Sequence, residues 1–105
     1  YFHELSSDEV YNLTEMNVNS TTIMTHLVLP GMVARRRGAI VNIASSAGCH
    51  TMPLLAQYSA AKGYIAMFSR ALQAECRGSN VTVQCQVPFY VATKLAKLRK
   101  AMTVI

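Results

Sequence analysis

Two short apolar segments separated by one long helical pattern constrain the fold of this chain most strongly. Residues 39–44 form an almost uninterrupted apolar run, and residues 81–87 are β-branched and alternating, so both are typical of strands. Between them, residues 55–77 carry apolar side chains at helical spacing, and Gly78 and Asn80 end the pattern. This succession of strand, helix and strand predicts a right-handed βαβ unit with parallel strands.

Another long helix is predicted before the first of these strands. Ser6 can cap its first turn, with Glu9 completing a capping box three residues later. Apolar residues then recur at helical spacing to about Arg36, Gly38 breaks the pattern, and Pro30 is expected to bend the helix. The order helix, strand, helix, strand predicts an α/β fold built around a parallel sheet.

Composition and charge exclude several classes of protein. No apolar run among the 105 residues reaches the ~18 that a membrane-spanning helix needs. Three cysteines without CxxC spacing and three histidines without HExxH spacing predict neither a metal site nor a disulfide framework. The net charge of +5 comes mainly from residues 35–37 and 94–100, which lack the aromatic interleaving of a nucleic-acid platform. We therefore expect no nucleic-acid partner, and we interpret residues 35–37 as solvated surface.

A proton donor and a cation stand together near the start of the helix over residues 55–77. Tyr58 and Lys62 are four residues apart, so they lie on one helical face. A phenol with the usual pKa of about 10 donates protons poorly at neutral pH, and a nearby ammonium favours its ionised form. Ser45 directly follows the first strand, and residues 88–93 follow the second. Because ligands bind outside the carboxyl ends of parallel strands, these residues should border one crevice.

The sequence resembles the short-chain dehydrogenase/reductase family over nearly its whole length. The resemblance rests on motifs in the family's order and spacing: Met16-Asn17-Val18-Asn19-Ser20, Leu29-Pro30-Gly31-Met32, Gly38-Ala39-Ile40-Val41-Asn42-Ile43, Ser45, Gly48, Tyr58-Ser59-Ala60-Ala61-Lys62 and Val87-Pro88 to Thr93. It implies a Rossmann-type doubly wound parallel sheet, of which residues 1–105 are the C-terminal, catalytic half. The N-terminal, nucleotide-binding half with its glycine-rich loop is absent from this stretch, so we expect a piece of a larger domain.

By this resemblance, Asn17, Ser45, Tyr58 and Lys62 form the catalytic tetrad. Tyr58 is implied to donate a proton to the substrate oxygen, and Ser45 to donate a second hydrogen bond to it. Lys62 is implied to activate Tyr58 and to bind the nicotinamide ribose of the cofactor, and Tyr58 is implied to contact the cofactor as well. Asn17 is implied to hold a water molecule that connects Lys62 to solvent.

Residues 88–93 resemble the family's loop around the nicotinamide carboxamide, which implies that Pro88, Val91 and Thr93 also bind the cofactor. Residues 87–100 and 26–33 resemble the type 12 and type 3 17-beta-hydroxysteroid dehydrogenases. Phe89 stands where most of the family has glycine, and this branch tends to have an aromatic residue there. This branch implies an NADP(H)-dependent oxidoreductase that acts on a 3-oxoacyl-CoA or a 17-ketosteroid. It also implies a homodimer at the endoplasmic reticulum, with this stretch facing the cytosol.

Two other functions are weighed against this one. An inactive hydroxysteroid dehydrogenase-like branch shares much of the sequence but has phenylalanine at the position of Tyr58, so the tyrosine argues against a non-enzymatic role. A serine hydrolase is excluded because no Gly-x-Ser-x-Gly elbow surrounds Ser45 or Ser46.

Overall fold

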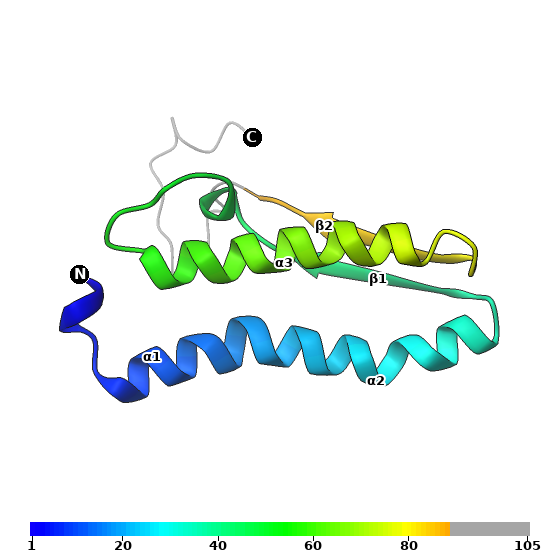
Figure 1. Ribbon diagram of the computed structural model, residues 1–105, viewed down its shortest axis with the longest axis horizontal. Coiled ribbons are helices and arrows are strands. Elements are labelled where there is room, and N and C mark those ends of the chain that lie inside the picture. Colours follow the sequence, from blue (N-terminus) through cyan, green and yellow to red (C-terminus); the bar gives the residue numbers. More distant parts are fainter. Residues whose placement is uncertain (89–105) are drawn as a thin grey trace, which may run out of the picture.

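A computed structural model describes residues 1–88 of the chain (Figure 1). In chain order the elements are η1 (Phe2–Glu4), α1 (Ser7–Thr14), η2 (Glu15–Asn19), α2 (Ser20–Ala34), β1 (Gly38–Ile43), η3 (Ser46–Cys49), α3 (Ala56–Glu75) and β2 (Val81–Gln86). Figure 1 shows α3 lying along the two strands, with the helical segment from α1 to α2 beside it. The predicted α/β order of helix, strand, helix, strand is confirmed, and the two strands are parallel.

The first long helix is interrupted by a π-helical turn that the sequence pattern did not predict. This turn, η2, joins α1 to α2, and its closing bond runs from the Ser20 N–H to the Glu15 carbonyl five residues earlier. Pro30 lies inside α2 without ending it, and the helix continues to Ala34. π-turns inside helices occur frequently at functional sites, and this one contains Asn17.

The capping box predicted at the start of α1 is present. Ser6 Oγ accepts a hydrogen bond from the Glu9 N–H at 3.2 Å, and the Glu9 carboxylate accepts one from the Ser6 N–H at 2.7 Å. These bonds stabilise the ionised carboxylate and lower the pKa of Glu9, the Ser6 backbone N–H being the larger cause. The entrance of the long helical segment is therefore fixed by local contacts.

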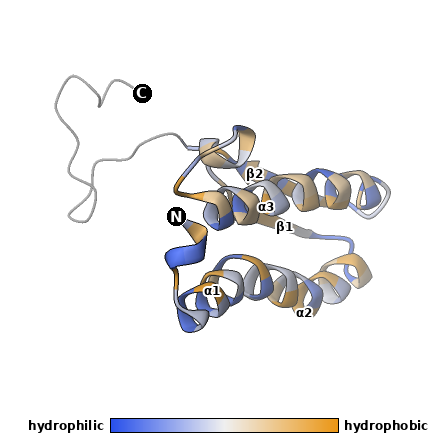
Figure 2. Cartoon of the chain, turned by 60° about the vertical axis from the view of Figure 1, so that its left-hand side comes forward, coloured by the Kyte–Doolittle hydropathy of each residue, from blue (hydrophilic) through white to orange (hydrophobic). Residues whose placement is uncertain are grey.

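One face of the two-stranded sheet is covered by α3, and apolar residues on the other face are exposed. β1 pairs with β2 in parallel, in register from Gly38 opposite Val81 to Ile43 opposite Gln86. Two apolar clusters lie between the sheet and α3: Leu72 with Cys76, Val81 and Val83, and Ala44 with Ile65 and Ala66. On the opposite face Val41 is 53% exposed and Ile43 is 55% exposed. Figure 2 shows hydrophobic residues along the helices as well. Several apolar side chains of α2 are exposed.

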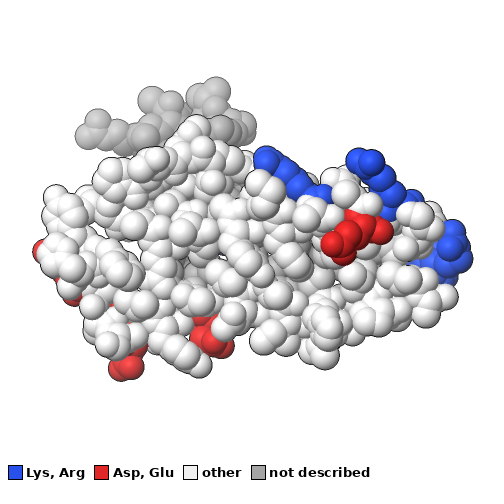
Figure 3. Space-filling model, in the orientation of Figure 1, with Lys and Arg blue, Asp and Glu red and all other residues white. Residues whose placement is uncertain are grey.

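Two loops are tied together at the end of the molecule where the strands begin. Arg36 Nη2 donates to the Gly78 carbonyl at 3.2 Å, and Asn80 Nδ2 donates to the Arg36 carbonyl at 2.8 Å. Arg36 and Asn80 both adopt the left-handed conformation, with φ of 53° and 56°. Lys and Arg side chains gather at this end (Figure 3), and residues 35–37 are all exposed, as expected of solvated surface.

Within residues 1–88, no helix has the length and hydrophobicity needed to cross a bilayer. The same part of the chain contains no group of three acidic, histidine or cysteine side chains placed to hold a metal ion. Cys49, Cys76 and Cys85 are free thiols.

Candidate active site

Ser45 lies where the chain leaves β1. Its backbone is extended, with φ of −160°, and its Oγ accepts a 3.2 Å hydrogen bond from the Ala47 N–H, which caps η3. Backbone pairing continues past the strand ends, because the Ser46 N–H donates to the Pro88 carbonyl at 3.1 Å. The ends of both strands are thereby held side by side, and Ser45 and Pro88 lie at the same edge of the sheet.

Tyr58 and Ser45 share a cavity. Tyr58 stands in the first turn of α3, and both side chains line a cavity of about 340 Å³. The remaining lining residues are Ser46, Ala47, His50, Met52 and Leu55. The cavity therefore combines three hydroxyl-bearing residues, Ser45, Ser46 and Tyr58, with a partly apolar wall, a combination that suits an apolar ligand carrying a polar group.

Lys62 lies against Tyr58 one turn further along α3. Its Nζ is 5.6 Å from the centroid of the Tyr58 ring, and it donates to the Ile43 carbonyl at 3.4 Å. The ammonium thus lies between the tyrosine and the end of β1. It retains donors for a further partner, because an ammonium group has three N–H bonds.

Asn17 lies on the neighbouring helical segment and does not line this cavity. Its Nδ2 donates to the Leu13 carbonyl at 2.9 Å, and the side chain is half-buried in η2. The turn η2 contacts α3, and within residues 1–88 no hydrogen bond joins the Asn17 side chain to that helix. The structure therefore brings Ser45 and Tyr58 to one cavity with Lys62 against Tyr58, and it places Asn17 on a different element, η2, which contacts α3.

A close contact between two glycines sets the spacing of this site. A Cβ added to Gly48 would lie 2.6 Å from the Gly63 nitrogen and 2.6 Å from the Lys62 carbonyl carbon. A Cβ added to Gly63 would lie 3.2 Å from the Gly48 oxygen. Sequence reasoning did not single out Gly63. The signal was available, because glycine inside a helix costs about 1 kcal/mol of stability relative to alanine. At Gly63 the absence of a side chain allows the close approach of Gly48.

Two predicted cofactor residues lie outside the described part of the chain. Pro88 is described at its margin, whereas Val91 and Thr93 fall in residues 89–105. Their predicted contact with a cofactor stays a prediction.

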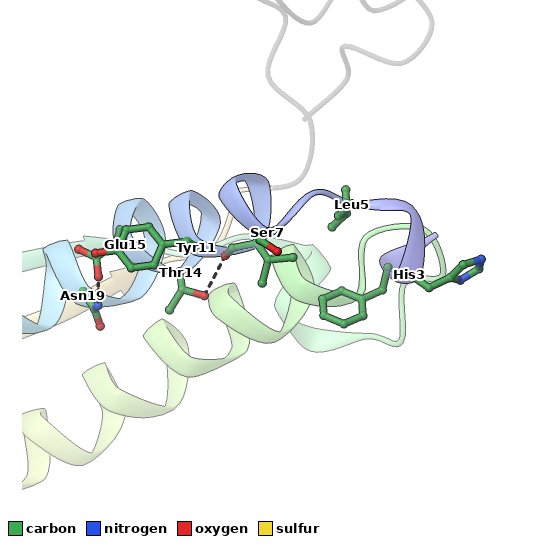
Figure 4. A pocket seen from close by; sticks show the side chains of 9 residues that line it. His3, Leu5, Ser7, Tyr11, Thr14, Glu15 and Asn19 are labelled. Carbon is green, nitrogen blue, oxygen red and sulfur yellow. Dashed lines mark hydrogen bonds between the residues drawn. The ribbon is translucent and has the colours of Figure 1, made fainter.

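A larger cavity, of about 600 Å³, lies along η1, α1 and η2 (Figure 4). Its walls include Phe2, Leu5, Val10, Tyr11 and Glu15, and the Glu15 carboxylate accepts a hydrogen bond from Asn19 there. None of Asn17, Ser45, Tyr58 or Lys62 lines it. Cavity size alone therefore does not identify the candidate site, and the smaller cavity, which both Ser45 and Tyr58 line, is the better candidate.

Comparison with known proteins identifies the class of protein that this fold and site define. The sequence profile described as short chain dehydrogenase matches residues 1–103, and the chain belongs to this family. It is 46% identical over 95 residues to "Inactive hydroxysteroid dehydrogenase-like protein 1" of Homo sapiens, covering 90% of this chain and 29% of that protein. It is 43% identical over 105 residues to "Very-long-chain 3-oxoacyl-CoA reductase" of Laccaria bicolor, covering 100% of this chain and 31% of that protein.

Solved structures agree with this assignment. A 3-oxoacyl-[acyl-carrier protein] reductase with bound NAD from Brucella melitensis superimposes with a TM-score of 0.79 at 34% identity, covering 87% of this chain and 35% of that one. The closed form of serine dehydrogenase complexed with NADP+ gives a TM-score of 0.82 at 33% identity, covering 86% and 36%. The chain is thus part of a Rossmann-type fold, and these two structural neighbours hold NAD and NADP+. It spans about three tenths of the curated relatives that it matches.

Proposed function

We propose that the protein containing this chain is an oxidoreductase that transfers a hydride between NADP(H) and a carbonyl or secondary alcohol of a lipid substrate. The observation that carries this proposal is the shared cavity of Ser45 and Tyr58, with the Lys62 ammonium 5.6 Å from the Tyr58 ring centroid. Residues 1–105 would supply the catalytic half, and a nucleotide-binding half would belong to another part of the same protein.

The arrangement suits the reduction of a ketone. Hydride addition leaves negative charge on the carbonyl oxygen, so one group must protonate it and another must stabilise the developing charge. Tyr58 would donate the proton from its phenol. Ser45 Oγ already accepts the Ala47 N–H, so its own O–H remains to donate to the substrate oxygen.

The residues fit a nicotinamide cofactor. Bound NADP(H) would supply the hydride. The Lys62 ammonium keeps donors for a ribose hydroxyl after bonding the Ile43 carbonyl, and Pro88 lies at the edge where β1 and β2 end. Val91 and Thr93 complete the proposed set around the carboxamide.

Asn17 is assigned the supply of protons. Its Nδ2 is bound to the Leu13 carbonyl, which leaves Oδ1 to accept a hydrogen bond from a water molecule. Such a water would connect Lys62 to solvent and restore the proton that Tyr58 gives up.

The substrate class rests on the relatives and on the cavity wall. The relative from Laccaria bicolor is named a very-long-chain 3-oxoacyl-CoA reductase, and Met52 and Leu55 give the cavity apolar surface. We assign a 3-oxoacyl-CoA or a 17-ketosteroid as substrate and the endoplasmic reticulum as location.

The whole protein is proposed to be a homodimer. On α2, Ile23 is 58% exposed and Leu27 is 69% exposed, and Met67 of α3 is 63% exposed. Such apolar side chains on two adjacent helices favour burial against a second copy. Light scattering on the full-length protein and on Leu27→Glu tests this, because the substitution should yield monomers, and an unchanged mass would contradict it.

A catalytically inactive protein is the second candidate, favoured by the 46% identity to a human relative whose name calls it inactive. The two functions differ at Tyr58. A hydroxyl at this position, facing the Ser45 cavity, has a use in proton transfer and no evident use in a protein without chemistry.

The test uses the full-length protein with NADPH and with 3-oxoacyl-CoA and 17-ketosteroid substrates. Tyr58→Phe should lower kcat by about a hundredfold or more, because a positioned acid contributes at least that much. Tyr64→Phe is the matched control, since Tyr64 lies on the same helix and its hydroxyl bonds Thr22 instead. Undiminished turnover in Tyr58→Phe would rule out Tyr58 as the proton donor, and no turnover by the unmodified protein would support the inactive alternative.

A further inference from the structure

We propose that Gln57 is a positioning residue that locks the helix carrying Tyr58 to the helical segment carrying Asn17. Its Nε2 donates to the Val10 carbonyl at 2.6 Å and to Thr14 Oγ1 at 2.9 Å. The catalytic part of this inference rests on the proposed reductase function.

Gln57 lies in the first turn of α3, next to the proposed proton donor. It directly precedes Tyr58, and Leu55, the cap residue of α3, makes no side-chain hydrogen bond to the first turn. The orientation of this turn therefore depends on contacts with neighbouring elements. Gln57 supplies two hydrogen bonds of this kind, both to α1.

The other end of the link leads to Asn17. Val10 and Thr14 belong to α1, whose last residue is Thr14, and η2 begins at the next position. Asn17 donates to the Leu13 carbonyl in the same turn of the helix. Gln57, next to Tyr58 in sequence, is thus bound to the last turn of α1, and the helical segment continues from there directly into the turn that contains Asn17.

Packing alone gives little reason for an amide at this position. Gln57 Oε1 is buried and has no hydrogen-bond partner among the residues that the structure describes. An unpaired buried carbonyl is unfavourable, so an apolar side chain of equal length would fill the space without this cost. What the amide adds is direction, because its two N–H bonds specify how α3 is rotated against α1.

The Gln57 link fixes the distance between Tyr58, the proposed acid, and Asn17, which is proposed to help resupply its proton. Tyr58 and Asn17 lie on different helical segments, and proton transfer between groups on the two requires a fixed separation. A misplacement of about 1 Å is enough to lower a rate by up to a hundredfold. Loss of the Gln57 bonds should therefore affect the chemical step more than cofactor binding.

The experiment compares Gln57→Met with Gln73→Met in the full-length protein. Methionine keeps the length of glutamine without its donors, and Gln73 is an exposed residue of the same helix. In Gln57→Met we expect kcat to fall about tenfold with the KM for NADPH unchanged, and the thermal midpoint to be no lower than in the unmodified protein. Gln73→Met should match the unmodified protein in all three.

The partner side of the link gives a second comparison. Thr14→Val keeps the shape of the side chain and removes one acceptor, so its effect on kcat should be smaller than that of Gln57→Met. In the double variant the two effects should not add, because both substitutions break the same link. Full additivity would show that Gln57 does not act through α1.

Hydrogen exchange tests the link without reference to activity. Amides of residues 13–19 should exchange faster in Gln57→Met and at the original rate in Gln73→Met. Unchanged exchange in Gln57→Met would overturn the proposal, and so would a lowered thermal midpoint with kcat intact, which indicates an ordinary structural contact. If the unmodified protein reduces no ketone, the proposed function fails, while the exchange comparison still decides whether Gln57 joins the two helices.

Discussion

Asn42 Nδ2 donates a 2.9 Å hydrogen bond to Ser69 Oγ and so ties the buried side of β1 to the middle of α3. Both residues are buried, with Asn42 7% exposed and Ser69 2% exposed. The Ser69 hydroxyl in turn donates to the Ile65 carbonyl at 2.7 Å. This polar contact fixes the position of α3 along β1. Its strand residue, Asn42, lies three residues before Ser45.

Ser69→Ala should destabilise the full-length protein by about 1–3 kcal/mol, because it leaves the Asn42 amide buried without its acceptor. Urea unfolding measures the change. Ser59→Ala is the control, since within residues 1–88 the Ser59 hydroxyl bonds only the Ala56 carbonyl of its own helix, at 3.1 Å. Equal stability of the two variants would show that the Asn42 bond contributes nothing.

Gly48→Ala should displace η3 from α3. Its Cβ would meet the backbone at 2.6 Å, and backbone atoms of a helix cannot move aside as a flexible side chain can. We expect kcat/KM to fall about tenfold, because Ser45 moves with η3 relative to Tyr58. Gly78→Ala is the matched control, as nothing lies within 4 Å of its added Cβ. Steady-state kinetics of both variants decide the point, and unimpaired turnover by Gly48→Ala would contradict it.

Lys62→Met should weaken NADPH binding and lower kcat, because it removes the ammonium between Tyr58 and the end of β1 while keeping an unbranched side chain. Fluorescence titration with NADPH gives the binding constant, and single-turnover measurements give the chemical step. Arg70→Met, an exposed cation of the same helix, controls for loss of charge alone. If both variants bind NADPH equally well, Lys62 has no part in holding the cofactor.

Glu9 provides a pH-dependent contribution to stability. Its pKa is lowered from 4.5 in the folded chain, so the capping box favours folding above that value, and this contribution is lost as the pH falls through the lowered pKa. Glu9→Gln removes the titrating group. The difference in thermal midpoint between the unmodified protein and Glu9→Gln should be constant at neutral pH and should shrink below about pH 4.5. An identical difference at pH 7 and pH 3 would contradict this.

Local sequence signals were sufficient to predict the order of elements. Hydrophobic periodicity distinguished the two helical segments from the two strands, and the capping box at Ser6 and Glu9 fixed where the first helix begins. The parallel pairing followed from the long helix between the strands. These features depend on neighbours in sequence or on general rules of connection, so they can be read without a structure.

Other features depend on contacts between distant segments, and the sequence did not reveal them. The π-turn at Glu15–Asn19 adds only one residue to one turn, and apolar positions on both sides of it still recur every three or four residues, so periodicity predicted one continuous element. The role of Gln57 depends on its hydrogen bonds to α1, and the role of Gly63 depends on its close contact with Gly48. The structure places Ser45 and Tyr58 on one cavity, whereas their catalytic roles stay predictions.

The π-turn also affects how the rotational setting of α1 can differ among related proteins. Each residue of an α-helix advances the chain by about 100° around the axis, so one extra residue accommodated in η2 changes the rotational phase of everything that precedes it. Deleting a single residue between positions 15 and 19 would restore regular winding and turn the face of α1 that meets Gln57 toward another direction. Relatives that differ by one residue in this segment should therefore differ in the angular setting of the whole entrance to the site, with no other change in sequence required.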